Sequence, residues 1–367
     1  MNSATASPPS QTLSHLELVR AAILAPSPDN NQPWRFVAEG DRLLVHLDPQ
    51  RALPSDVNAM YDLMGLGAAI ENASIAASQS GYESHVEYAT LQTTPADDAP
   101  SHVATMSFRP GGDPDPLSAC LATRCTCRKL YSTQPVADDR LERLGDAARE
   151  FPDVQLDWIT DRRRVRAFAR LIAVSDRFRF QYEPFHKEIF RQLRFSPEDA
   201  ERTRDGLDVR TLELPPGSAA LLRLLRPWSR MRLVNRVGLG RLLTWPSALS
   251  VWKSGNLGVL SLPEPGATGF IRGGRAFQRI WLATEAENLA LQPLGSLPIF
   301  LAQMAQLGGR NLTPAHQELS QRLGQWLGQL VPTITGRTLT MVFRLGYSSP
   351  PRVRSLRRPA EDVCDCQ

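Results

Sequence analysis

The feature that most constrains the fold of this chain is a segment that occurs twice. Residues 105–111 read Thr-Met-Ser-Phe-Arg-Pro-Gly and residues 340–346 read Thr-Met-Val-Phe-Arg-Leu-Gly, so five of the seven positions are identical. A long helical pattern precedes each copy, and the pattern around Gly67 aligns with the one around Gly274. Strand-like residues precede each of these helices. The repeat therefore predicts two similar α+β halves that pack through their long helices.

Hydrophobic periodicity and the placement of Pro and Gly predict the individual elements. Helices are predicted at 14–25, 60–81, 117–122, 138–149, 161–194 (two helices), 270–291, 298–307 and 314–330, and strands at 37, 43–47, 84–89, 103–108, 154–159, 257–262 and 339–345. We expect residues 1–12 to be a disordered leader, 13–112 to be the first repeat and 113–367 to be the second. Residues 195–250 have no clean period and are too long for a connector, so they predict a lid insertion.

The composition is that of a globular protein, because 42% of the 367 residues are hydrophobic and 22% are charged. A net charge of +4 gives no reason to expect a nucleic-acid partner. No stretch approaches the roughly 18 apolar residues that a membrane helix needs, and the N-terminus lacks a secretory pattern. We therefore expect a cytoplasmic protein with no membrane partner and with reduced thiols, since its five cysteines are an odd number. Only three of the 42 basic residues are lysines, a bias typical of a GC-rich bacterial genome.

One loop carries an unusual density of binding groups. Residues 25–36 read Ala-Pro-Ser-Pro-Asp-Asn-Asn-Gln-Pro-Trp-Arg-Phe and follow a helical pattern. The two early prolines end the helix, and a strand begins near Phe36. The polar side chains and amides between them are therefore free to bind, as is common in loops.

This loop resembles a signature of the nitroreductase superfamily of flavin enzymes, in which the loop lies against FMN. The matching positions are Ala25, Pro26, Ser27, Asn30, Gln32, Pro33, Trp34 and Phe36. Together with the internal repeat, the chain resembles the tandem, Acg-like branch of that superfamily. The resemblance implies an α+β, nitroreductase-like fold, in which two tandem repeats form a pseudo-dimer with central antiparallel sheets flanked by helices.

The resemblance also implies residues that hold the FMN phosphate. Arg124-x-Thr126-x-Arg128 is similar to the phosphate motif of the family, and arginine suits phosphate because its fork bonds two oxygens and stays charged. The basic tail resembles the closing motif of the family. In the tail Arg357 is the first candidate for the same phosphate, followed by Arg354 and Arg358.

Two further groups of site residues follow from the resemblance. The first loop places Pro26, Ser27, Pro28 and Asn30 against the cofactor. At the end of the second long helix, backbone N–H groups are expected to face flavin N5 and O4, where such donors stabilise the reduced ring. Because Pro293 has no N–H, the candidates are Leu294, Gly295 and Ser296.

The two halves differ in a way that predicts a single site. The counterpart of the first loop, residues 147–154, reads Ala-Ala-Arg-Glu-Phe-Pro-Asp-Val and lacks the signature. The first half also has no Arg-x-Thr-x-Arg segment ahead of its loop. Only one composite site is complete, so we predict one FMN per chain.

The predicted function is that of an FMN-dependent oxidoreductase that transfers hydride through flavin N5 to or from a small organic substrate. NAD(P)H is a candidate electron donor, and no side-chain catalyst or metal is required. The alternative is a flavin-binding, sequestering protein with little turnover. The pseudo-dimer within one chain leaves open whether the molecule is a monomer or a higher homo-oligomer.

Other motifs each allow more than one interpretation. Cys125-x-Cys127 and Cys364-x-Cys366 allow a zinc site or a redox pair, although the spacing is tight for zinc. His186 allows either an active-site acid or an ordinary buried histidine.

Overall fold

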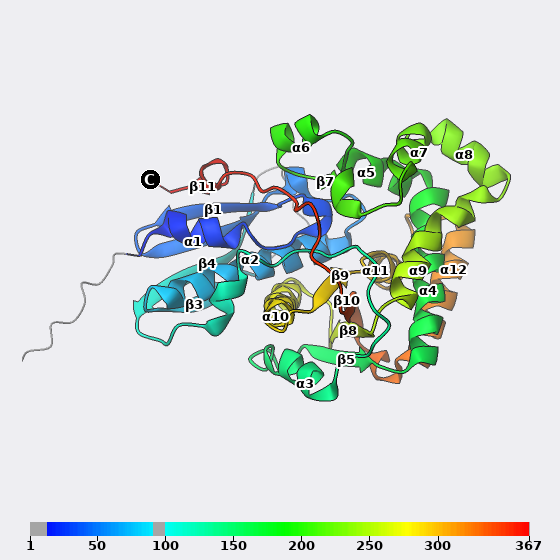
Figure 1. Ribbon diagram of the computed structural model, residues 1–367. Helices are drawn as coiled ribbons and strands as arrows, with labels where there is room; N and C mark the ends of the chain where they lie inside the picture. The colour runs from blue at the N-terminus through cyan, green and yellow to red at the C-terminus, as the bar shows by residue number, and fades with distance from the viewer. Residues whose placement is uncertain (1–12, 91–99, 367) are drawn as a thin grey trace, which may run out of the picture.

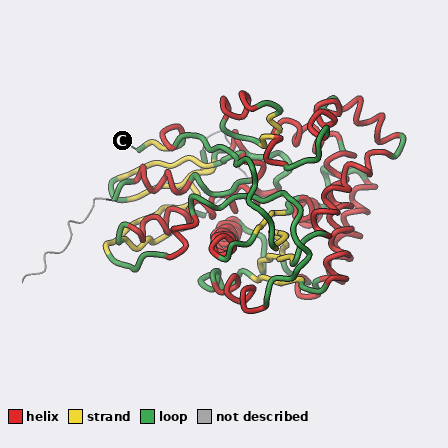
Figure 2. Tube along the Cα trace, viewed as in Figure 1, coloured by secondary structure: helices red, strands yellow, loops and turns green. Residues whose placement is uncertain are grey.

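The computed structural model describes residues 13–90 and 100–366, so the predicted leader at 1–12 lies outside the described residues. The described chain forms two sheets with helices around them, as Figures 1 and 2 show. The helices are α1 (His15–Ala22), α2 (Met60–Gln79), α3 (Asp138–Asp146), α4 (Arg162–Gln181), α5 (Glu183–Gln192), α6 (Pro197–Thr203), α7 (Ser218–Leu225), α8 (Trp228–Arg236), α9 (Trp245–Trp252), α10 (Ala267–Ala286), α11 (Ser296–Leu307) and α12 (Pro314–Leu330).

The two main sheets have the same strand order. The strands are β1 (Trp34–Glu39), β2 (Arg42–Leu47), β3 (Tyr82–Tyr88), β4 (Ser101–Pro110), β5 (Gln155–Ile159), β8 (Asn256–Leu262), β9 (Ala290–Pro293), β10 (Thr338–Gly346) and β11 (Cys364–Asp365). The first sheet runs β11-β1-β2-β4-β3 and the second runs β5-β8-β10-β9. In each half the long helix follows the second strand, and the duplicated sequence segment lies in β4 and β10. The α+β architecture of two tandem repeats is therefore as predicted.

Within each of the two main sheets the strands of the same half pair antiparallel, and one strand crosses between the halves. The C-terminal β11 runs parallel to β1, with Phe36 opposite Cys364. The amide of Phe36 also donates to the carbonyl of Val363 at 2.8 Å. The end of the second half is thereby fixed to the first sheet, and the tail that leads to it must pass the loop at residues 25–32.

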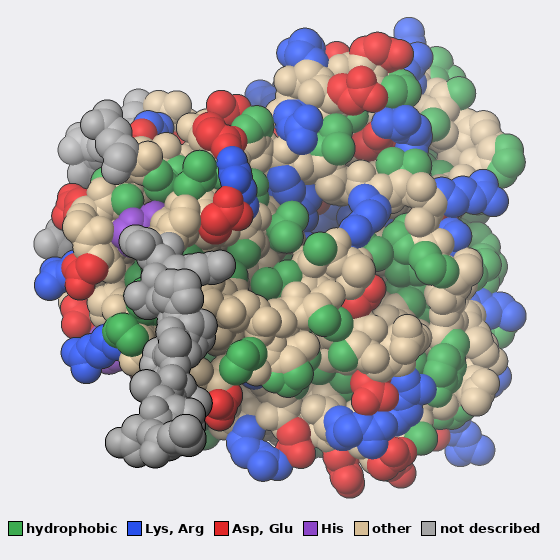
Figure 3. All heavy atoms as spheres, turned by 60° about the vertical axis from the view of Figure 1, so that its left-hand side comes forward, with side chains coloured by type: hydrophobic (Ala, Val, Ile, Leu, Met, Phe, Trp, Pro, Cys, Tyr) green, Lys and Arg blue, Asp and Glu red, His purple; other side chains and the backbone are tan. Residues whose placement is uncertain are grey.

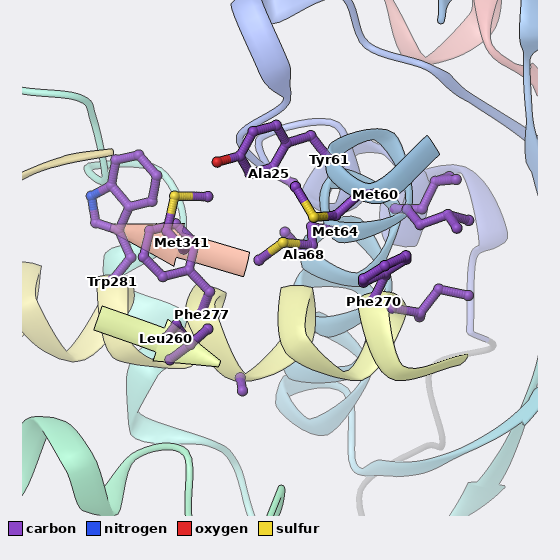
Figure 4. Close-up of a cluster of buried hydrophobic side chains, with 14 of the residues drawn as sticks. Ala25, Met60, Tyr61, Met64, Ala68, Leu260, Phe270, Phe277, Trp281 and Met341 are labelled. Carbon is purple, nitrogen blue, oxygen red and sulfur yellow. The ribbon is translucent and has the colours of Figure 1, made fainter. Parts of the chain in front are cut away.

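The long helices α2 and α10 cross at the centre of the molecule, where two glycines make the close approach possible. A Cβ atom on Gly67 would lie 2.0 Å from the carbonyl oxygen of Ile271, and one on Gly274 would lie 2.0 Å from that of Met64. The two contacts are equivalent, because each pairs a glycine with the residue three positions before the other glycine. Figure 4 shows apolar side chains of both helices packed around this crossing.

The halves differ most between their first two strands. In the first half, β1 and β2 are joined by a tight turn at Gly40, whose φ of +60° is the left-handed region that glycine tolerates. In the second half, helices α4 to α9 fill residues 160–255 between β5 and β8. The insertion is therefore longer than the predicted 195–250, since α4 and α5 also belong to it. It includes two short strands, β6 (Leu193–Arg194) and β7 (Leu207–Asp208), and the 3-10 helices η5 (Val209–Leu212) and η6 (Leu239–Thr244).

Two predicted helices are corrected. The segment at 117–122 is a 3-10 helix, η4 (Pro116–Cys120). The helix predicted at 270–291 ends at Ala286, because Asn288 takes a left-handed conformation (φ 52°) that stops it, and the next residues form β9.

Candidate functional site

The loop after α1 has a strained backbone. Asp29, Asn30 and Gln32 adopt left-handed conformations, with φ of 47°, 59° and 52°. Such angles are uncommon outside glycine, although Asn and Asp adopt them more readily than other residues. The 3-10 helix η1 (Pro28–Asn30) turns the chain here, and the Ser27 hydroxyl accepts a hydrogen bond from the Gln32 amide at 3.0 Å. Strain of this kind is concentrated at functional sites.

Asn30 joins three distant segments of the chain. Its side-chain amide donates to the carbonyls of Gly206 (3.0 Å) and Leu356 (3.1 Å), and its Oδ1 accepts from the guanidinium of Arg357 at 2.8 Å. The asparagine is buried. Its side chain therefore positions the insertion and the C-terminal tail over the first loop.

Gln32 does the same from the other side of the loop and was not among the predicted site residues. It is fully buried, its Nε2 donates to the Arg204 carbonyl at 2.8 Å and its Oε1 accepts from the Arg358 amide at 2.8 Å. Gln32 is one of the positions that match the family signature, and this match could have identified it as a site residue.

Three arginines from two segments meet beside this loop. The guanidinium of Arg124 donates to the Leu24 carbonyl at 2.6 Å, that of Arg357 donates to the Ala25 carbonyl at 3.0 Å, and that of Arg354 donates to the Arg124 carbonyl at 2.8 Å. Arg124 also lies over the ring of Trp281, 4.6 Å from its centre. We call Arg124, Arg354 and Arg357 the arginine cluster.

The cluster has no anionic partner among the described residues. None of its three arginines forms an ion pair within residues 13–90 and 100–366. The Nε atoms of Arg124 and Arg357 are buried and have no hydrogen-bond partner there. Burial, with repulsion from Arg357 next, lowers the pKa of Arg124 to about 9. Burial and repulsion from Arg354 lower the pKa of Arg357 to about 10. Unpaired cations, of which Arg124 is buried and Arg357 is half-buried, are the setting that a bound anion would stabilise.

The other predicted phosphate residues lie outside the cluster. Arg128 donates to the Thr211 carbonyl at 3.2 Å, and burial lowers its pKa while nearby Asp29 opposes this. The guanidinium of Arg358 donates to the Asp362 carbonyl at 3.2 Å. Thr126 lies between Arg124 and Arg128 in the sequence and is half-buried, and its side chain forms no hydrogen bond within the described part of the chain. The structure therefore brings three of the six predicted phosphate residues together, and the assignment of the other three to the cofactor stays a prediction.

The structure at the start of α11 reduces the number of backbone N–H groups that could donate to the flavin. The Leu294 amide donates to the Val342 carbonyl at 2.7 Å, so this N–H is already used and Leu294 is corrected as a donor. Gly295 and Ser296 begin α11, and the described residues give their amides no partner. Tyr61 of α2 donates from its hydroxyl to the Gly295 carbonyl at 3.2 Å. The N-terminus of α11 thus presents free N–H groups near the crossing of the long helices.

A small polar cavity of about 20 Å³ lies between the first loop and the start of α11. Its lining includes Asp29, Ser55, Arg179, Glu188 and Ser296. The Ser55 amide donates to the carboxylate of Glu188 at 2.7 Å, and the Ser55 hydroxyl bonds to the same carboxylate. Burial raises the pKa of Glu188. Sequence reasoning missed this cavity, because α5 brings Glu188 to the first loop only through tertiary packing.

Asp56 and Asp62 lie close by at the start of α2. Burial, with their mutual repulsion, raises the pKa of Asp62, and burial also raises that of Asp56. Asp56 accepts the amides of Tyr61 and Asp62, and Asp62 accepts from the Asn31 side chain at 2.7 Å. These carboxyls therefore fix the end of the first loop and favour protonation.

The structure also places His186 and the cysteines, for which the sequence left alternatives open. His186 is fully buried in the insertion, where its ring bonds to the Leu225 carbonyl at 3.1 Å, so it is a core histidine. Cys127 contacts Ser348 and Ser349. Cys364 of β11 and Cys366, which follows the strand, are joined by a disulfide, which corrects the expectation that all thiols are reduced. Within residues 13–90 and 100–366 no three His, Cys, Asp or Glu side chains are grouped for a metal ion.

Two curated proteins are similar to this chain. The chain is 30% identical over 344 residues to the uncharacterized protein MT1398 of Mycobacterium tuberculosis (strain CDC 1551 / Oshkosh), covering 93% of this chain and 47% of that protein. It is 28% identical over 178 residues to the putative NAD(P)H nitroreductase acg of the same strain, covering 47% of this chain and 51% of that protein.

Over about half of its length the chain thus resembles a relative that is named a putative nitroreductase. The chain spans about half the length of the curated relatives that it matches. No family model matches it. Among solved structures, an FMN and NADPH-dependent nitroreductase NfnB from Sphigopyxis sp. strain HMH is 20% identical, covering 68% of this chain and 98% of that chain, with a TM-score of 0.38.

Proposed function

We propose that this nitroreductase-like chain is an FMN-dependent oxidoreductase that exchanges hydride between a nicotinamide donor and a small organic substrate. The observation that carries the proposal is the arginine cluster. Three guanidiniums without a carboxylate, two of them with a buried and unpartnered Nε, lie against the loop of the family signature. A dianionic phosphate would satisfy these donors and offset the cost of burying the charges.

The residues fit the cofactor at both of its ends. Arg124, Arg354 and Arg357 would hold the phosphate. The amides of Gly295 and Ser296 would face the opposite, polar edge of the ring, where the positive end of α11 favours negative charge. When bound, FMN supplies the hydride chemistry, and the protein supplies placement and electrostatics.

The first loop would form the wall of the site. Pro26, Ser27 and Pro28 are half-buried, so their surfaces remain available for contact. Arg128 would serve a different part of the cofactor from the phosphate, because it lies near Asp29 and Thr211. Arg358 would act through its backbone amide, which holds Gln32 in place.

The insertion would close the site. Residues 204–206 are fixed to the first loop by Gln32 and Asn30, and Arg204 donates to the Arg357 carbonyl at 2.7 Å. Asp205 forms ion pairs with Arg51 of the first half (2.5 Å) and Arg194 of the insertion (2.6 Å). This segment would act as the predicted lid and restrict the substrate to small molecules.

A second candidate function is flavin storage. The hydrogen bonds and ion pairs that fix the lid favour flavin storage, since a cofactor held beneath the lid would exchange slowly with free FMN. A site completed within one chain would need no partner subunit for either function. A cytoplasmic location, where nicotinamide donors are available, belongs to the same proposal.

The test is anaerobic reduction of the FMN-loaded protein. The proposal predicts a visible flavin spectrum that bleaches on addition of NADH or NADPH and recovers on addition of a nitroaromatic or quinone. A flavin that stays oxidised with both donors and with organic substrates would favour storage. A chain that cannot be loaded with FMN would overturn both functions.

A further inference from the structure

The insertion carries almost all of the large apolar side chains that the described residues expose. Outside it only Leu130 is of this kind. The exposed group of the insertion consists of Leu221, Leu224, Leu233, Val237, Leu239, Leu242, Trp245 and Trp252. Single exposed apolar residues are ordinary, but a concentration in one segment indicates an interaction surface.

The part of the insertion that carries these side chains is basic. Between residues 214 and 263 there is no Asp or Glu. The basic residues in this range are Arg223, Arg226, Arg230, Arg232, Arg236, Arg241 and Lys253. The whole chain carries only +4, so the remaining residues are together net negative by three. The positive charge of the protein is therefore concentrated where its apolar side chains are exposed.

The exposed side chains gather at one corner, formed by α8 and η6. Leu233 and Val237 are one turn apart on α8 and are 60% and 62% exposed. After the left-handed Gly238 the chain turns back, and η6 packs so closely that a Cβ on Gly240 would lie 2.0 Å from the Asn235 side chain. We call Leu233, Val237, Leu239, Leu242 and Trp245 the apolar tip. Figure 1 shows α7 and α8 at the outer edge of the molecule, at the opposite end from the first sheet.

The arginines around the apolar tip are not neutralised. None of the six exposed arginines of this segment forms an ion pair with a described residue. Other exposed helices differ, since Lys187 pairs with Glu183 and Arg322 with Glu318. Figure 3 shows such mixed acidic and basic side chains over another face of the molecule.

We propose that the apolar tip and its arginines dock on an anionic lipid surface. Apolar side chains that include an exposed tryptophan enter the interface between headgroups and acyl chains, and surrounding arginines pair with anionic headgroups. A protein partner fits less well, because the exposed positive charges have one sign over the whole segment. No helix of the described residues is long and apolar enough to cross a bilayer. Surface docking needs no such helix, and it revises the expectation of no membrane partner.

The test is sedimentation of the full chain with vesicles of mixed phosphatidylglycerol and phosphatidylcholine, and with vesicles of phosphatidylcholine alone. The proposal predicts binding to the anionic vesicles only, weakening as NaCl rises. Replacing Arg230, Arg232 and Arg236 by Gln should weaken binding roughly 100-fold, at about a factor of ten or less per charge. A matched control replaces Arg149, Arg202 and Arg322 by Gln, because these exposed arginines lie outside residues 214–263 and give the same net charge.

A second variant tests the apolar contribution. Leu233→Ser with Val237→Ser and Leu242→Ser should also abolish sedimentation, while its thermal unfolding stays close to that of the parent chain because these side chains are exposed. Equal binding to both vesicle types, or an arginine variant that binds like its control, would overturn the proposal. So would a dimer in solution that dissociates in the serine variant, since the apolar tip would then be an interface between two copies.

Discussion

Two groups of arginines at the interface of the repeats have opposite surroundings. Around the loop of the second half, Arg272 pairs with Asp153, and both Arg275 and Arg279 pair with Glu71. Around the loop of the first half, the arginine cluster meets only carbonyls and the ring of Trp281. The repeats thus share a fold, but the arginines beside the loop of the second half pair with carboxylates, whereas those beside the loop of the first half form no ion pair within the described residues. Such charge is costly unless a ligand completes it, so the difference indicates where an anion binds.

The two loops also differ in what lies beside them. Residues 147–154 border a largely apolar cavity of about 560 Å³, whose lining includes Phe151, Leu156 and Trp158. The first loop is instead covered by the insertion and the C-terminal tail. The symmetry of the helices and sheets therefore does not extend to the binding groups.

The largest expected effect concerns the symmetric crossing of α2 and α10. Gly67→Ala should destabilise the protein by about 3 kcal/mol or prevent folding, because its Cβ would overlap the Ile271 carbonyl. Gly274→Ala should cost a similar amount, since its contact with Met64 is equivalent. Chemical denaturation measures both. Gly328→Ala in α12 is the control, because nothing lies within 4 Å of its Cβ, and it should be neutral or stabilising. A loss at one glycine and not the other would contradict the two-fold arrangement.

The next effect separates the two groups of arginines. Arg357→Gln should weaken FMN binding by roughly 100-fold, because it removes charge-assisted hydrogen bonds in a buried site. Arg272→Gln should leave FMN affinity within about twofold and lower stability instead, since Arg272 already has Asp153 as its partner. Isothermal titration with FMN and thermal unfolding measure the two outcomes. Equal losses of affinity in both variants would remove the distinction between the groups.

A smaller effect is expected at the lid. Burial acts to raise the pKa of Asp205, but hydrogen bonds from Arg194 and Arg51 outweigh it and lower the pKa. Asp205→Asn should loosen the segment over the first loop and speed FMN release by about tenfold. Stopped-flow displacement of FMN measures the rate, and Asp199→Asn, an exposed carboxylate on α6, is the control. Unchanged release would mean that the insertion does not hold the cofactor.

The smallest effect is a pH dependence in the paired group. The hydrogen bond from Arg272 holds the pKa of Asp153 below its ordinary value. The resulting stability is present at neutral pH and is lost as pH falls from about 4 through the folded pKa. Asp153→Asn should flatten this acid limb and cost about 1 kcal/mol or less at neutral pH, because the pair is about a third exposed. Unfolding measured across the acid range tests this, and an unchanged acid limb would contradict the pairing.

The sequence predicted the repeat architecture well, because strand alternation and long helices are local signals. It located Arg124, Arg354 and Arg357, yet it could not separate them from Arg128 and Arg358. The direction of a long arginine side chain depends on which segments pack around it. The full insertion was also missed, since α4 and α5 have ordinary helical patterns that give no sign of where they sit between strands.

The cavity beside Ser296 could not be predicted from the sequence for the same reason. Glu188 meets Ser55 across 133 positions of sequence, so no spacing indicates their contact. The short strand β9 escaped prediction because only residues 287–289 separate it from the preceding helix.

The most direct test of the central claim is native mass spectrometry of the FMN-loaded chain and of a variant with both Arg124→Gln and Arg357→Gln. A single composite site predicts one FMN per chain in the parent and none in the double variant, with both folded by circular dichroism. Two bound FMN molecules, no FMN after loading, or full retention by the double variant would contradict the account.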